Sequence, residues 1–486
     1  MTDGPHYRRL ADWMFRHPIA TVMSVAFTVR AVVALVLNVT NTWSLAPDAH
    51  QYLALAEAVS AGRLDSFWPG YGPSLYNSTR VFSGQVVFLF DLFGPYRISA
   101  QLVAVFYGSL TAGLTVLLAR RFIRPAFALA AGLVVALVPS QILWSTVALR
   151  ESTIWALLAG IAVILGNLSP TSTRRSIFVA VLSVAMAYLC LESLRGQTAF
   201  LALWSGTLAL LVGRGDRRAR VVAAAALLLV APLAANHQPG AVDLLYTASK
   251  RLGTVRTYMA MGAESTIYDS TSRSDDGMLP GADIDGSVDP EGSDSVVPGG
   301  DEIDLLERES TVVLPGADID GSVDPEGSDS VVPGGNEIDL LERESTVVDG
   351  QKFVVDADGN AFPVYNDLEA NLQAFPSGLM AAAVRPFPWD SRQTGKHLAS
   401  SIESVFWASV FILAAVGTWF RRRELGVVAF PVVFSVVYLV SAALTQGNLG
   451  TAFRHRAQIL FAIVLLAFAG VQVLWDRRKS RNLWPS

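Results

Sequence analysis

The most regular feature of the chain is a series of long apolar runs separated by short polar stretches. The first run, Ile19 to Val39, is long enough to cross a bilayer and about twice the length of a signal-peptide core, which favours a retained anchor. The pattern predicts ten membrane-spanning helices, at residues 19–39, 98–119, 125–139, 152–168, 177–193, 198–213, 219–235, 401–420, 426–444 and 457–475. The apolar run from Val81 to Gly94 is shorter and contains Asp91, which favours an interfacial helix over a span.

These runs divide the chain into three parts. Residues 1–235 form an N-terminal transmembrane module with a first outer loop at 40–97, residues 236–400 form one long outer loop, and residues 401–486 add the last three helices. Composition agrees with this division, because 52% of the residues are hydrophobic and only 16% are charged. We therefore expect an all-α polytopic membrane protein of about ten transmembrane helices, with an interfacial first outer loop and a long, largely disordered outer loop.

The long outer loop changes in composition along its length. Residues 241–262 predict a surface helix and residues 376–397 an interfacial return segment. Residues 270–350 are rich in Asp, Ser, Gly and Pro, which predicts disorder or loosely ordered hairpins. This polar stretch contains a tandem duplication, residues 279–313 and 314–348, and the two 35-residue copies differ at a single position.

The repeats also carry Asp-x-Asp-Gly motifs, at 283–286 and 318–321, and a third copy stands at 356–359. Their spacing does not follow the EF-hand loop, which requires glycine at the sixth position and an acid at the twelfth. Asp-Gly is equally a common turn sequence. Calcium binding and a plain acidic linker therefore both stay open.

Charge supports one orientation in the membrane. The net charge of −5 conceals a basic membrane part, because the two repeats alone carry −17 and the remainder of the chain +12. With ten spans, every basic cluster falls on the same side, and cytoplasmic loops are enriched in Lys and Arg. These clusters are Arg8/Arg9/Arg16, Arg120/Arg121/Arg124, Arg174/Arg175, Arg214/Arg217/Arg218/Arg220, Arg421/Arg422/Arg423 and Arg477/Arg478/Lys479/Arg481. We expect both termini to be cytoplasmic.

Other residue types exclude several functions. The single cysteine, Cys190, allows neither an intramolecular disulfide nor a cysteine-based metal site. Nothing in the sequence indicates nucleic-acid binding.

Asp48 follows directly on the first predicted span. As an ordinary interfacial acid it would cap a helix that opens near Gln51 and Tyr52. Alternatively it is a general base at the membrane surface, where partial desolvation brings a carboxylate pKa closer to neutral pH.

Further ionisable residues are predicted at the same outer ends of the helices. One helix ends with Glu192 and Arg195, another begins with Arg150 and Glu151, and the last is preceded by Arg454, His455 and Arg456. Charged residues are costly in this region and commonly mark a functional site. Several arginines beside two carboxylates suit an anionic lipid-phosphate substrate, because arginine binds phosphate bidentately. Arg30, in the middle of the first span, has no assigned role.

Four stretches carry a resemblance to a known family. The chain resembles membrane glycosyltransferases of the GT-C superfamily, and more narrowly the protein mannosyltransferase and aminoarabinose-transferase type, whose bacterial relatives use polyprenyl-phosphate sugars. The resemblance lies in a first-loop aspartate motif, a first-loop segment, a second acidic corner and a late arginine-containing turn, at 47–54, 70–73, 143–152 and 450–458. It covers residues 1–235 and 398–475 and leaves out 263–370. The first-loop motif has one acid where the family has an acidic pair.

The resemblance implies inverting transfer of a sugar from a polyprenyl-phosphate donor to a glycan, lipid or protein acceptor, on the outer face of the plasma membrane of a bacterium. Asp48 would deprotonate the acceptor hydroxyl, and Glu151 would orient the acceptor or hold a divalent cation, which the chemistry does not require. The donor phosphate would bind Arg150, Arg454 and Arg456, with Arg195 behind them. His50, Tyr52 and His455 are accessory candidates.

Two alternatives to this function remain. A polymerase or ligase of lipid-linked oligosaccharides would use the same arginines without Asp48 as a base. A lipid-glycan flippase or transporter would instead place charges or broken helices near the midplane and repeat its helices internally, and neither feature is evident in the sequence.

Overall fold

The computed structural model describes most of the two predicted membrane parts and little of the loop between them. The described residues are 13–42, 47–68, 71–168, 172–213, 217–228, 345–348, 351–355, 361–364, 368–387, 395–445 and 449–481. The expected surface helix at 241–262, both repeats up to residue 344 and the motif at 356–359 lie outside these ranges.

Each of the ten predicted spans coincides with a helix. The ten helices are α2 (Pro18–Val39), α5 (Arg97–Ala119), α6 (Pro125–Leu137), α8 (Glu151–Gly166), α9 (Arg174–Glu192), α10 (Gly196–Val212), α11 (Arg217–Leu228), α16 (Gly395–Phe420), α17 (Ala429–Thr445) and α19 (Leu460–Arg481). Within the described residues, six stretches are long and apolar enough to cross a membrane; they lie in α2, α5, α9, α16, η5–α17 and α18–α19. Helices α6, α8 and α10 are apolar but shorter. Helix α11 meets neither criterion, and residues 229–235 of its predicted span lie outside the described ranges. The full set of ten spans therefore stays a prediction.

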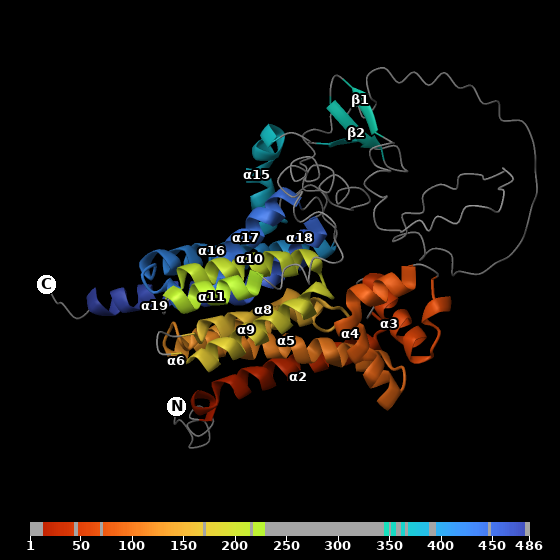
Figure 1. Cartoon of the computed structure of the whole chain (residues 1–486), viewed down its shortest axis with the longest axis horizontal. Coiled ribbons are helices and arrows are strands. Elements are labelled where there is room, and N and C mark those ends of the chain that lie inside the picture. The colour runs from red at the N-terminus through yellow and green to blue at the C-terminus, as the bar shows by residue number, and fades with distance from the viewer. Residues whose placement is uncertain are drawn as a thin grey trace, which may run out of the picture.

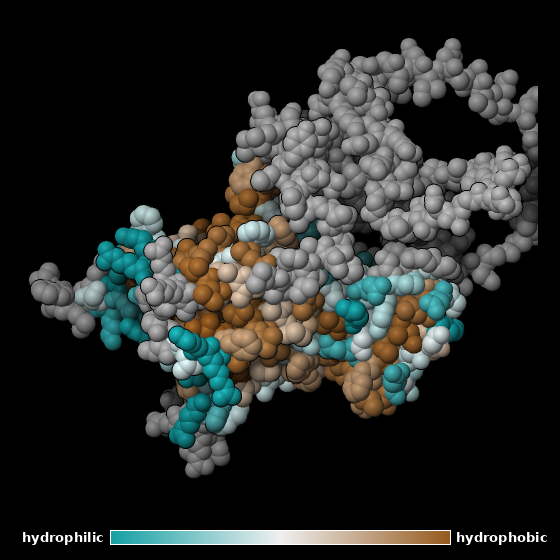
Figure 2. All heavy atoms as spheres, viewed as in Figure 1, coloured by the Kyte–Doolittle hydropathy of each residue, from teal (hydrophilic) through white to brown (hydrophobic). Residues whose placement is uncertain are grey.

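The surface of the bundle matches an apolar surrounding. Large hydrophobic side chains are exposed along the helices, among them Leu35 at 58%, Phe178 at 68% and Ile412 at 66%. Figure 2 shows this hydrophobic band in the middle of the bundle, with hydrophilic residues gathered toward its two ends. Such an exposed apolar band is expected of helices that face lipid.

Smaller elements lie at one end of the bundle, away from the two termini (Figure 1). They are α3 (Pro47–Ser60), η1 (Leu64–Ser66), α4 (Tyr71–Phe93), α7 (Pro139–Trp144), α15 (Leu368–Ala383), α18 (Leu449–Arg456) and η6 (Ala457–Ile459). A short helix, η5 (Leu425–Val428), instead precedes α17 at the opposite end. A small antiparallel sheet, β1 (Ser345–Val348), β2 (Gln351–Val355) and β3 (Ala361–Val364), pairs Val348 with Gln351 and Val355 with Ala361.

Three local predictions are wrong in their limits. The helix expected to open near Gln51 begins at Pro47, so Asp48 lies in its first turn rather than before it. The interfacial helix expected from Val81 begins at Tyr71. The late turn is instead the short helix α18 followed by η6, because Leu449–Arg456 lacks a proline that would interrupt a helical turn.

The core is built around α5 and α19, which pack against neighbours on several sides. Close approach of α16 to α19 depends on two glycines. A Cβ at Gly417 would collide with the carbonyl oxygen of Leu466, and a Cβ at Gly470 with that of Leu413. The backbones of these two helices therefore touch, as small residues allow in membrane bundles.

Basic residues meet at the end of the bundle that also holds both termini (Figure 1). Arg421, after α16, donates to the carbonyl of Phe122 in the α5–α6 turn. Arg124 pairs with Asp476 near the end of α19 at 2.9 Å. The basic turns thus gather at one end, and the predicted site residues lie at the other.

Arg30 receives a role that the sequence left unassigned. It is fully buried, and its Nε donates to Ser145 Oγ at 2.7 Å. Its Nη1 donates to the carbonyl of Ala136 at 2.7 Å, in the last turn of α6. Helix α6 ends here because Val138 precedes Pro139 and is extended. Arg30 therefore caps α6 from the neighbouring helix α2 and satisfies carbonyls that the break leaves open.

Candidate functional site

Residues from four parts of the chain meet at the end of the bundle opposite the basic turns. Asp48 lies in the first turn of α3, and Glu151 opens α8. A carboxylate is favoured in both places by the helix dipole. Arg195 stands in the turn between α9 and α10, and Arg454 lies in α18. The structure therefore brings together residues separated by about 400 positions in the sequence.

Glu151 is the centre of this group. Its side chain is only 2% exposed, and its Oε1 accepts from Arg195 Nη2 at 3.1 Å. The same oxygen lies 3.3 Å from Arg454 Nε. Its second oxygen, Oε2, is buried and has no hydrogen-bond partner within the described residues. A carboxylate held in this way fixes two arginines from opposite halves of the chain.

Arg454 joins Glu151 to Asp48. Its Nη1 donates to Asp48 Oδ2 at 2.9 Å, and the Asp48 side chain is 39% exposed. The charges thus alternate from Asp48 through Arg454 and Glu151 to Arg195. Asp48 is the most accessible end of this series, and Glu151 the most enclosed.

Arg150 lies beside this series and contacts the first outer loop. Its Nη1 donates to the carbonyl of Ser78 in α4 at 3.1 Å, and its guanidinium lies 5.8 Å from the centre of the Tyr52 ring. Burial raises the pKa of Tyr52 to about 12, so its hydroxyl stays protonated at neutral pH.

The group carries more positive than negative charge. Three arginines face two carboxylates, and Arg195 Nη1 and Arg150 Nε are buried without a hydrogen-bond partner in the described part of the chain. Burial raises the pKa of Glu151, but Arg454, Arg195 and Arg150 outweigh it and leave that pKa below its ordinary value. Glu151 is therefore ionised at neutral pH, and one positive charge is left over for an anion.

Two of the predicted residues lie apart from this group. Arg456 is fully buried, with its guanidinium 4.3 Å from the Phe453 ring and 4.9 Å from the Trp407 ring. Its Nη1 donates to the carbonyl of Arg385 at 2.9 Å, so it fastens α18 to the end of α15 and to α16.

His50 is largely exposed on α3. The partial burial of its ring and the charge of Arg97 both lower its pKa. His455 is half-buried beside Arg454 in α18.

A divalent cation finds no ready set of ligands in the described residues, where no three His, Cys, Asp or Glu side chains gather. Glu151, the residue considered for such an ion, has its Oε1 engaged by arginines.

Sequence reasoning missed Glu403, which lies in α16 and is 7% exposed. Its carboxylate accepts from the backbone N–H of Ser140 at 2.9 Å, from Ser140 Oγ at 2.6 Å and from Trp407 Nε1 at 2.9 Å. It therefore ties the start of α7 to α16 beside Arg456. The sequence feature that could have identified Glu403 is an acidic residue within an apolar run, because such a residue is costly in a membrane unless it is paired.

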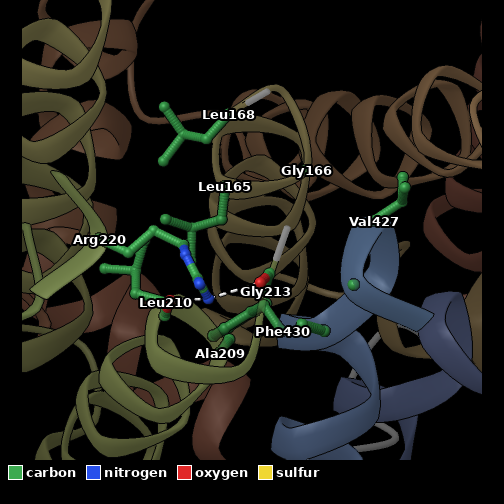
Figure 3. Close-up of a pocket in the computed structure, with 11 residues that line it drawn as sticks. Leu165, Gly166, Leu168, Ala209, Leu210, Gly213, Arg220, Val427 and Phe430 are labelled. Atoms are coloured by element: carbon green, nitrogen blue, oxygen red, sulfur yellow. Dashed lines mark hydrogen bonds between the residues drawn. The ribbon is translucent and has the colours of Figure 1, made fainter. Parts of the chain in front are cut away.

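A hollow lies at the opposite end of α8 from Glu151, and Figure 3 shows the residues that line it. Its cavity volume is about 30 Å³, which is room for about two water molecules. It is formed by the ends of α8 and α10, the start of α11, and η5 with the start of α17.

Comparison with known proteins finds no matching family model, no similar curated protein and no similar solved structure.

Proposed function

We propose that the protein is a membrane glycosyltransferase that moves a sugar from a polyprenyl-phosphate donor to an acceptor hydroxyl. The observation that carries the proposal is the arginine-rich group around Glu151, with surplus positive charge and buried N–H groups that lack a partner in the described residues. A phosphate oxygen would fill these positions. An exposed carboxylate, Asp48, stands next to them.

The residues suggest how the reaction proceeds. Asp48 takes the proton from the acceptor hydroxyl, whose oxygen attacks the anomeric carbon and inverts it. The bond from that carbon to the phosphate oxygen breaks, and polyprenyl phosphate leaves with an additional negative charge. Arg454, Arg195 and Arg150 stabilise that charge, so no general acid is needed. Glu151 touches the arginines rather than the reacting atoms, and it is a positioning residue.

The proposal includes an orientation in the membrane. Ten spans would place the basic end in the cytoplasm, with both termini, and the Asp48 end outside, in the plasma membrane of a bacterium. A reporter fused after Ser486 should be active only in the cytoplasm. Activity of that reporter only outside would reject this topology.

The decisive experiment measures transfer of a labelled sugar from polyprenyl phosphate by the purified protein in vesicles. Asp48→Asn keeps the shape of the side chain but removes the base, so turnover should fall by about 10²–10⁴-fold. Arg454→Gln should raise the KM for the donor by about 10- to 100-fold and also lower turnover, because it removes a charge-assisted contact to a phosphate whose charge grows as it leaves. Asp65→Asn, an exposed acid of the same outer loop, is the matched control and should leave both values unchanged.

Turnover of Asp48→Asn within tenfold of the parent would remove Asp48 as the base and favour a polymerase or ligase that uses the arginines alone. Absence of any transfer in the parent, together with lipid-glycan movement across vesicles, would favour a transporter.

A further inference from the structure

We propose that α15 positions Arg454 by holding α18 from the side opposite the charged group, and that Arg456 is the positioning residue. The proposal rests on the proposed function, in which Arg454 binds the donor phosphate. Arg456 was expected to bind that phosphate itself, but it lies between the rings of Phe453 and Trp407, apart from the charged group. Its contacts nevertheless hold the helix that carries Arg454.

The eight-residue helix α18 has two faces with different partners. Ala452 and Arg456 are four positions apart and therefore share one face. Each residue of an α-helix advances by about 100° around the axis, so Arg454, midway between them, points in nearly the opposite direction. On that side Arg454 contacts the carboxylates of Asp48 and Glu151. The charged group therefore holds α18 from one side only.

Helix α15 occupies the other side of α18. Ala381 and Ala452 are both buried and pack against each other. Arg456 Nη1 donates to the carbonyls of Ala383 at 3.3 Å and Arg385 at 2.9 Å, at the end of α15. Two small side chains let the helices approach closely, and the hydrogen bonds fix how α18 is turned about its axis.

Helix α15 is itself held by the bundle. A Cβ at Gly378 would collide with the carbonyl oxygen of Ala443, in the last turn of α17, so the two backbones touch there. Figure 1 shows α15 beside α17, at the end of the bundle that also holds α18. The position of α18 is thus set by α17 through α15, and not by the charged group alone.

A buried arginine is a costly means of joining two helices. Arg456 is fully buried, and its Nε and Nη2 have no hydrogen-bond partner in the described part of the chain. An apolar side chain would fill the space at a lower cost, but it would not fix a direction. The surface of a helix lies about 5–6 Å from its axis, so a rotation of about 20° moves a side chain by about 2 Å. Such a shift would break the 2.9 Å contact between Arg454 and Asp48.

The first test measures the KM for the polyprenyl-phosphate donor in the sugar-transfer assay. Arg456→Met keeps the length of the side chain but removes its N–H donors, so the donor KM should rise about tenfold and turnover should fall, as in Arg454→Gln. In the Arg454→Gln background the same change should alter the donor KM by less than about twofold, because the residue that Arg456 positions is already gone. A merely structural role would instead give the same loss in both backgrounds.

A second variant, Gly378→Ala, displaces α15 from α17 and leaves the Arg456 side chain intact, so it tests the proposal even if Arg456→Met fails to fold. It should also raise the donor KM about tenfold, and only when Arg454 is present. Gly160→Ala is the matched control, because a Cβ there would meet no neighbouring atom within 4 Å. A parent-like KM in Gly378→Ala would overturn the proposal, and so would equal losses with and without Arg454.

A readout without substrate separates this inference from the proposed function. In reversible unfolding, Glu151→Gln and Arg454→Gln should be coupled by about tenfold in the unfolding equilibrium of the parent, and by less than about threefold in Gly378→Ala. Unchanged coupling in Gly378→Ala would overturn the inference whether or not sugar is transferred. Loss of the coupling in a protein that transfers no sugar would support the positioning of Arg454 by α15 and reject the proposed function.

Discussion

Replacing Glu151 by glutamine should be among the most destabilising single changes at the charged group. The substitution keeps the size of the side chain and removes only its charge. Among the described residues, Arg195 then loses the carboxylate to which it is paired, and Arg454 keeps only Asp48. Breaking a buried pair typically costs 3–5 kcal/mol, because it leaves an uncompensated buried charge.

The expected cost is at the lower end of that range. The Arg195 and Arg454 side chains remain 12% and 20% exposed, so water partly screens them after the change. We expect a loss of about 3 kcal/mol, or roughly a hundredfold in the folding equilibrium. Asp48→Asn should cost less than about 1 kcal/mol, because Asp48 is 39% exposed.

The assay is reversible unfolding in mixed micelles, with sodium dodecyl sulfate as denaturant and helix content followed by circular dichroism. Glu57→Gln is the matched control, since Glu57 is an exposed acid on α3, and it should change the unfolding free energy by less than about 0.5 kcal/mol. A Glu151→Gln cost no larger than that of Glu57→Gln would refute the view that Glu151 organises the arginines.

Three further predictions follow from the same structure. Arg30→Leu should destabilise the protein by about 2 kcal/mol or more, because it leaves the carbonyl of Ala136 buried without a donor; the same unfolding assay measures it. Gly417→Leu should destabilise it by more, because the side chain would collide with the backbone of Leu466, whereas Gly84→Leu, at an open position on α4, should not. Because the folded-state pKa of Glu151 is lowered, its contribution is fully present above the ordinary glutamate pKa and is lost as pH falls through the folded value. Stability should therefore be flat from pH 7 to about 5 and fall more steeply below that in the parent than in Glu151→Gln, as the same unfolding assay measures.

The approximate positions of the helices could be predicted from the sequence, because long apolar runs indicate segments that can cross a bilayer and charged clusters indicate their ends. The same logic predicted that Asp48, Glu151 and Arg454 share one end, and the ion pairs of Arg454 confirm their proximity. What these residues do there was not decided by the pattern. Glu151 was considered for an acceptor or a cation, and the structure surrounds it with arginines.

The contacts of individual arginines could not be predicted, because they depend on side-chain packing that the spacing of residues in the sequence does not reveal. Arg454 and Arg456 are two positions apart on one short helix, yet Arg454 joins the charged group and Arg456 is stacked on Phe453 and Trp407. Residues two apart on a helix point in different directions, so one short motif serves two purposes. Arg30 was equally ambiguous, because most of its acceptors are backbone carbonyls, which have no sequence signature.

The two ion pairs of Glu151 also bear on how the protein is made. One partner, Arg195, is translated soon after Glu151, and the other, Arg454, only near the end of the chain. During synthesis the carboxylate would therefore hold one arginine while the place of the second stays open. The ion pairs of Arg454 cannot form until α18 has left the ribosome and α19 has packed in the core beside α5 and α6. A nascent chain thus carries an incomplete charged group while residues 236–400 are synthesised, and the group is completed only when α18 has been made.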